Sequence, residues 1–131
     1  MSFETYIIEG KAGRDAEMRY TPSGTAVTSF SVAVDNEYTT SMGEKVKEVK
    51  WIRVSAWGKL AEICNQYVKK CTAVLVEGRL KGDDKGNPRT YQNNFGETVA
   101  SFEMTASTVR LLGGRKESEK PATQPETEFP F

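Results

Sequence analysis

The stretch VKWIRVSAWGKLAEICNQY, residues 49–67, decides how the rest of the chain is read. Side chains of a β-strand point alternately to its two faces, and one face of this stretch is apolar and typical of a core: Ile52, Val54 and Ala56. The other face carries two indoles with a guanidinium and a hydroxyl between them: Val49, Trp51, Arg53, Ser55 and Trp57. Nucleobases stack on aromatic rings and phosphates pair with arginine, so this face is a candidate binding surface.

Gly58 follows this strand, and apolar residues then recur at helical spacing: Leu60, Ile63, Cys64, Tyr67 and Val68. The stretch therefore predicts a strand that leads directly into a short amphipathic helix.

Four more strands are predicted around this unit. They cover residues 3–20 with a bend at Gly10 and Gly13, residues 26–36, residues 72–81 with a bulge at Gly78, and residues 98–112. TPSG at 21–24 is a turn, and residues 36–46 and 82–96 are expected to be long loops. No strand-helix-strand repeat occurs, which disfavours a parallel sheet. The order predicts an all-β fold, a five-stranded antiparallel Greek-key barrel of the oligonucleotide-binding type with one short α-helix between strands 3 and 4.

Composition bounds the function. The 131 residues hold 18 basic and 18 acidic side chains, so any electrostatic footprint has to come from placement on one face. There is no histidine, which removes the commonest general base and zinc nitrogen ligand, and Cys64 and Cys71 have no metal-type spacing. We expect reduced cysteines, a cytoplasmic protein, no signal peptide, no membrane span, no cofactor and no catalytic residue.

The last part of the chain differs from the rest. Residues 113–131 lose all periodicity and are rich in charge and proline, so we expect a barrel over residues 1–112 and a disordered tail after it. The tail keeps two rings beside a proline after two acids: Glu126, Glu128, Phe129, Pro130 and Phe131. This pattern is expected to be a protein-docking tip, with a ring for an apolar slot and the terminal carboxylate for a basic one.

Several ordered motifs resemble the bacterial single-stranded DNA-binding protein family: RYTPSGTAV (19–27), KWIRVSAWGKLAEI (50–63), VEGRL (76–80) and LLGGR (111–115). The resemblance covers essentially the whole chain. It implies a homotetramer, with a dimer as the other possibility, that coats single strands near the nucleoid in replication, recombination and repair. It also implies stacking by Tyr38, Trp51, Trp57 and Tyr91, and recruitment of partner enzymes by the tip. Several positions depart from the family pattern: Ile52 where histidine is common, Cys71 where glycine is usual, Tyr38 and Tyr91 where tryptophan is common, and Phe129 in place of an aliphatic residue. The tail also has only Glu126 and Glu128 where a run of aspartates is typical.

We therefore predict a groove in which basic residues follow the DNA backbone and aromatic rings stack bases. The predicted set is Lys50, Trp51, Arg53, Trp57, Tyr38, Arg79, Lys81, Arg89, Tyr91 and Phe95. From alternation alone, Trp51 and Trp57 could equally be core or subunit-contact residues. Two other function classes stay open. One is a protein-interaction module, and the other is a metal-dependent nuclease that would use Asp83 and Asp84, a pair that is more typical of a turn.

Overall fold

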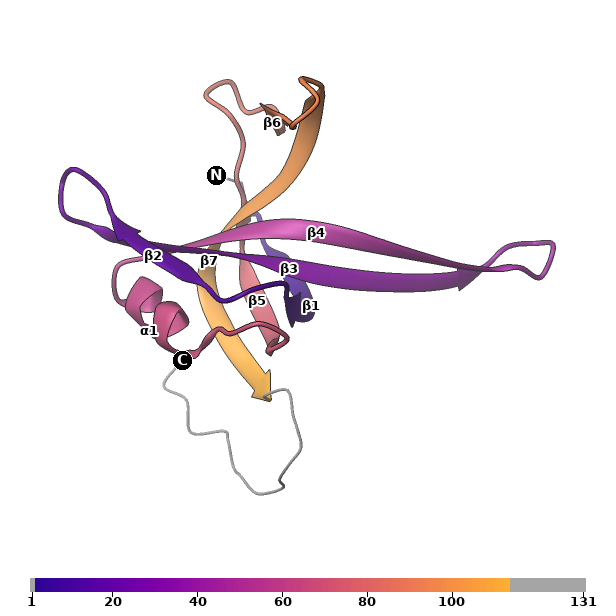
Figure 1. Ribbon diagram of the computed structural model, residues 1–131, viewed down its shortest axis with the longest axis horizontal. Coiled ribbons are helices and arrows are strands. Elements are labelled where there is room, and N and C mark those ends of the chain that lie inside the picture. The colour runs from indigo at the N-terminus through magenta and orange to yellow at the C-terminus, as the bar shows by residue number, and fades with distance from the viewer. Residues whose placement is uncertain (1, 114–131) are drawn as a thin grey trace.

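The computed structural model describes residues 2–113, which form seven strands and one helix (Figure 1). In chain order they are β1 (Tyr6–Ala12), β2 (Glu17–Tyr20), β3 (Ala26–Thr39), β4 (Lys45–Trp57), α1 (Lys59–Tyr67), β5 (Ala73–Leu80), β6 (Arg89–Gln92) and β7 (Thr98–Gly113). No helix in this part of the chain is long and apolar enough to cross a membrane.

Five of the strands close into a barrel in the order β1-β5-β7-β4-β3, and β3 returns to β1 where Lys11 pairs with Ala33 and Ala12 with Val32. All of these pairings are antiparallel except β4 with β7, which is parallel. The predicted barrel with one helix between its third and fourth strands is confirmed. The predicted first strand is divided into β1 and β2, and β2 pairs only with β3 in the described residues.

The core lies inside this barrel and under α1. Its fully buried side chains come from β3, β4, α1, the residue after α1, β5 and β7: Val32, Ile52, Val54, Cys64, Val68, Val74, Val76, Met104 and Val109. β1 adds Ile8 and Ala12, which are 7% and 3% exposed. Thr28 is also buried, and its hydroxyl donates to the Ala61 carbonyl of α1 at 2.6 Å. This hydrogen bond satisfies a polar group that would otherwise be costly to bury, and it joins the helix to β3.

Four turns share one design. Each begins with a Thr, Asp or Asn side chain that accepts the backbone N–H four residues later, and each has a glycine at its fourth position. The sequences are TPSGT (21–25), TSMGE (40–44), DDKGN (83–87) and NNFGE (93–97). The glycine φ values run from +81° to +91°, where a Cβ is disfavoured. The third residue of each turn is left exposed at its tip: Ser23, Met42, Lys85 and Phe95.

Both predicted long loops are shorter than expected. β3 continues to Thr39 and β4 begins at Lys45, so only the turn between them is loop, and the prediction of a long loop over residues 36–46 is wrong. We call the part of this ribbon outside the barrel, residues 35–49, the arm; it runs to the right in Figure 1. The prediction for residues 82–96 is wrong in part, because β6 pairs with β7 there. Both faces of these ribbons meet water, so their sequences lack an apolar alternation that would reveal the strands.

Candidate nucleic-acid interface

Trp51 and Trp57 lie on the outer face of β4, with 53% and 42% of their surfaces exposed. The core residues Ile52, Val54 and Ala56 point inward between them, as alternation predicted. The β3 residues that lie beside the indoles on this outer face are smaller than the rings: Ala33 pairs with Trp51, and Val27 pairs with Trp57. Neither indole is part of the core, and each presents surface on which a base can stack.

Trp51 is held against a second element. A Cβ added to Gly13 would lie 2.7 Å from Cζ3 of the Trp51 ring, so the indole packs directly on the Gly13 backbone, just after β1. Any larger residue at position 13 would push the ring away. The glycine that the sequence marked as part of a bend therefore also fixes the position of an exposed indole.

Arg53 lies between the two indoles and opposite Ser31 of β3. Two shallow hollows of about 380 Å³ and about 160 Å³ adjoin its side chain and share Glu17 and Ser29. Arg19 lines the first hollow and Arg14 lines the second. Three arginines thus line two adjoining hollows on the outer surface, together with Glu17 and Asp15, and arginine is well suited to bind phosphate oxygens.

Sequence reasoning missed Arg14 and Arg19. A signal for each was present, since Arg14 directly follows the glycine beneath Trp51, and Arg19 pairs in register with Val27, the partner of Trp57. The Arg14 signal requires the contact between Gly13 and Trp51, and the Arg19 signal requires the pairing of β2 with β3, neither of which the sequence states.

Arg89 and Arg79 extend the outer face across β7. Arg89 Nε lies 3.1 Å from Glu103 Oε1, and Glu103 is the register partner of Arg53, so this carboxylate lies beside two arginines. The ion pair is partly exposed and contributes little to stability, but it offsets a negative charge next to the candidate surface. Arg79 lies in the same outer row, because Thr105 pairs with both Arg79 and Ser55.

Tyr38 and Lys50 lie on the other face. Register partners share a face, and the unbroken β3–β4 ladder pairs Tyr38 with Val46 and Lys50 with Val34. These residues are in phase with buried Ile52 and out of phase with Trp51. The structure therefore divides the predicted set between two faces of one ribbon.

The remaining predicted residues lie around the β6–β7 hairpin. Tyr91 pairs with Val99 and is 54% exposed, and Phe95 is at the turn tip and 86% exposed. The backbone N–H of Lys81 donates to the Glu103 carbonyl at 2.9 Å, which places Lys81 at the base of the hairpin. Glu126, Glu128, Phe129, Pro130 and Phe131 lie outside the described residues.

Asp83 and Cys64 have structural roles, Asp83 in a turn and Cys64 in the core. Asp83 Oδ1 accepts the backbone N–H groups of Lys85 and Asn87, which is the turn role that its sequence suggested. Among residues 2–113 no group of three or more histidine, cysteine, aspartate or glutamate side chains is placed to hold a metal ion. Burial raises the pKa of the Cys64 thiol to about 12, so Cys64 behaves as a small apolar core residue.

Comparison with known proteins agrees with this geometry. A family model described as the single-strand binding protein family matches residues 3–112. The single-stranded DNA-binding proteins of two Neisseria meningitidis strains are 37% identical to this chain over 118 residues, which is 90% of this chain and 64% of theirs. Single-stranded DNA-binding protein 1 of Chlorobaculum tepidum is 36% identical, over 81% of this chain and 62% of that protein. The chain thus spans less than two thirds of the length of these curated relatives.

Two solved structures share the fold. A deletion mutant of the single-stranded DNA binding protein from Thermus aquaticus matches with a TM-score of 0.67 and 26% identity, over 86% of this chain and 52% of that one. The Plasmodium falciparum SSB in complex with single-stranded DNA matches with a TM-score of 0.70, over 86% of this chain and 97% of that one. The second is 18% identical, so it is a likeness of fold alone.

Proposed function

The chain belongs to the single-strand binding protein family, and on this premise we propose that it binds and protects single-stranded DNA without sequence preference. Members of this family bind DNA and are not enzymes. The observation that carries the proposal is the outer face of β4, where two indoles with 53% and 42% of their surfaces exposed flank Arg53. In this mechanism the indoles stack bases, which is independent of sequence because every base has a π-face.

The arginines supply the backbone contacts. Arg14, Arg19 and Arg53 line two adjoining hollows on the outer surface, and each phosphate that they neutralise releases counterions from the strand. Binding should therefore weaken with salt, with a logarithmic slope of about −0.7 for each neutralised phosphate. Because the chain has equal numbers of basic and acidic residues, this local cluster has to produce the slope.

Titration with oligothymidine at low salt tests the proposal directly, with tryptophan emission as the signal. We expect quenching on binding, and we expect Trp51→Ala to lower the affinity by about 5- to 150-fold, the equivalent of one lost stacked base. Tyr20→Ala is a matched control, since Tyr20 is an exposed aromatic of β2 outside the predicted set. Unchanged emission together with no complex at low salt would rule out DNA binding and favour the protein-interaction module.

Self-association is a second part of the proposal. The family resemblance suggests a homotetramer, and the edge of β1 supports a strand-to-strand contact. Tyr6 to Glu9 pair with β5 on one side, and in the described residues β1 pairs with β3 only at Lys11 and Ala12, next to the contact of Gly10 with Ala33. Ile7 on this segment is 57% exposed, so a second copy can both pair with the free edge and cover an apolar side chain. Light scattering on the purified protein distinguishes monomer, dimer and tetramer.

Residues 113–131 are proposed as a tail that recruits replication, recombination and repair enzymes, which would act with the protein at the nucleoid. The support is compositional, since Phe129 and Phe131 flank a proline and follow Glu126 and Glu128. Deletion of residues 129–131 should abolish enzyme binding and leave DNA affinity equal or higher. Loss of DNA affinity in this variant would contradict the assignment.

A further inference from the structure

Phe102 is an exposed aromatic at the mouth of the barrel. It is the register partner of Ile52, and partners share a face, yet Ile52 is fully buried while Phe102 is 55% exposed. Its ring therefore lies on the inward side of the sheet, at the point where the barrel ends and no further layer covers it among the described residues. An aromatic ring left uncovered at the end of a core strand is available to a ligand.

Lys50 provides a cation beside this ring. Its Nζ lies 5.6 Å from the centroid of the Phe102 ring. Lys50 is two residues from Ile52 on β4, so it is on the same side of the sheet as Phe102 and on the opposite side from Trp51. The pair repeats, on the second face of β4, the combination of ring and positive charge that Trp51 and Arg53 make on the first.

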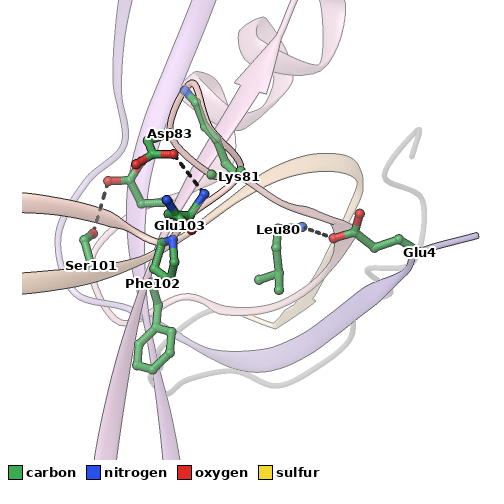
Figure 2. A pocket seen from close by; sticks show the side chains of 11 residues that line it. Glu4, Leu80, Lys81, Asp83, Ser101, Phe102 and Glu103 are labelled. Atoms are coloured by element: carbon green, nitrogen blue, oxygen red, sulfur yellow. Dashed lines mark hydrogen bonds between the residues drawn. The ribbon is translucent and has the colours of Figure 1, made fainter.

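A cavity of about 490 Å³ adjoins Phe102 and has one apolar side (Figure 2). Phe102 and Leu80 point the same way, and Lys81 and Asp83 point to the opposite side. The carboxylates on its wall are already engaged. Glu4 Oε2 accepts the Leu80 N–H at 3.2 Å, Asp83 Oδ1 accepts two turn N–H groups, and Glu103 is paired with Arg89. Phe102 and Leu80, which are 55% and 53% exposed, form the apolar side of the lining.

We propose that Phe102 and Lys50 form a second nucleotide subsite, in which the ring stacks one base of single-stranded DNA and the ammonium group pairs with a neighbouring phosphate. The subsite rests on the proposed function. It also explains why Tyr38 is on this face, since Tyr38 lies four residues beyond Val34, the partner of Lys50. At about 3.3 Å per residue, Tyr38 and Lys50 are about 13 Å apart along the ribbon. Successive phosphates of a DNA strand are at least about 3.4 Å apart, so at most about four nucleotides of single-stranded DNA span the distance from Lys50 to Tyr38.

The two faces then form one continuous path. Trp51 and Arg53 bind the strand on the outer face, and Phe102, Lys50 and Tyr38 bind it after it passes the edge of the ribbon. A short oligonucleotide occupies one face only, whereas a long one engages both. The contribution of Phe102 is consequently visible with long oligonucleotides and small with short ones.

Phe102→Leu tests the ring separately from its apolar volume. Leucine still covers the barrel mouth but offers no π-face, and we expect the affinity for long oligothymidine to fall about 5- to 150-fold. Phe102→Tyr should bind like the unaltered protein. Lys50→Ala should weaken binding and reduce the magnitude of the salt slope by about 0.7. Equal affinity of the Phe102→Leu variant and the unaltered protein for long oligothymidine would overturn the subsite.

Photo-crosslinking with oligonucleotides that carry 5-iododeoxyuridine provides a direct second measurement. We expect a crosslink at Phe102 by peptide fragmentation, and its absence while Trp51 is crosslinked would also overturn the subsite. Trp51→Ala separates this inference from the proposed function. If Trp51→Ala weakens binding and Phe102→Leu does not, only the subsite fails; if the unaltered protein binds no oligonucleotide, the proposed function fails with it.

Discussion

One part of β3 and of β4 belongs to the barrel and the other part belongs to the arm, residues 35–49, and the two parts are stabilised differently. In the barrel half, Phe30, Val32, Ile52 and Val54 are at most 3% exposed. In the arm, every side chain from 35 to 39 is exposed, although the same hydrogen-bonded ladder continues from Val27–Trp57 to Thr39–Lys45. Backbone pairing therefore continues where the core ends. Ladders without buried apolar contacts open locally at low free energy, so the arm should open independently of the barrel.

This difference also divides the candidate binding residues. Trp51 is on the barrel half and is anchored on Gly13, while Tyr38 is on the arm and pairs only with Val46 across the ladder. An anchored ring loses little conformational entropy when a base stacks on it, and an arm can adjust to the path of the strand. Rigid and adaptable contacts thus lie on one continuous ribbon.

The largest effect that separates the two halves is expected for Ile52→Ala. This side chain is fully buried in the barrel half of β4, and its truncation leaves a cavity, so the free energy of unfolding should fall by about 2–5 kcal/mol. Chemical denaturation followed by circular dichroism measures it. Arg53→Ala is the matched control, since the neighbouring side chain is exposed and should change stability by less than about 0.5 kcal/mol. Similar losses for both variants would mean that the faces are not divided as described.

An effect of similar size is expected from strongly alkaline pH, and it acts through the barrel. The pKa of Cys64 is raised from 9.0 to about 12 by burial, so between these values the unfolded chain releases a proton that the folded chain keeps. Stability is thus unaffected by this thiol below pH 9 and falls as pH rises from about 9 to 12, by about 1.4 kcal/mol per pH unit. Cys64→Ala should show a shallower decline in denaturation midpoints over this range. An equal decline in both proteins would show that other groups cause it.

Most strands of the barrel could be predicted from the sequence because each has one solvent-exposed face and one buried face. The apolar alternation of β4 and the helical stripe after Gly58 reflect burial, and both are found in the structure. The bulge at Gly78, predicted from a glycine within a strand, is also found. The arm and β6 could not be predicted in this way, because both of their faces are solvated. The turns were the available signal, since TSMGE and NNFGE have the pattern of TPSGT.

The candidate site was predictable only as a set of residues. Which face each residue occupies depends on register, and the length assumed for the loop before β4 hid the register of Tyr38. The roles of Phe102 and Arg19 require knowledge of which strand lies next to β4 and β3, and the parallel β4–β7 pairing has no local signature in sequence. Alternation predicted that the indoles lie on the face opposite Ile52 and Val54, whereas their exposure and the division of the set between two faces required the structure.

The smallest effects on stability are expected from two substitutions at residues with left-handed backbone conformation, one in the barrel and one in the arm. Among the described residues, Cys71 is the one non-glycine residue with positive φ, at 72°, while the arm turn has Gly43 at 85°. A Cβ in this conformation costs about 1 kcal/mol. Cys71→Gly should therefore stabilise the barrel by up to about 1 kcal/mol, and Gly43→Ala should destabilise the arm turn by about the same amount.

The two measurements differ because the two regions unfold differently. Cys71 donates its N–H to the Ala12 carbonyl at 2.8 Å and so belongs to the barrel, and its replacement should raise the global denaturation midpoint. A Cβ at Gly43 would meet no atom within 4 Å, so the Gly43→Ala effect is purely conformational and local. It should speed hydrogen exchange at the Tyr38 and Val46 amides and leave exchange at Val54 unchanged. Equal acceleration at all three amides would show that arm and barrel unfold as one unit, because a local opening cannot expose an amide in the core.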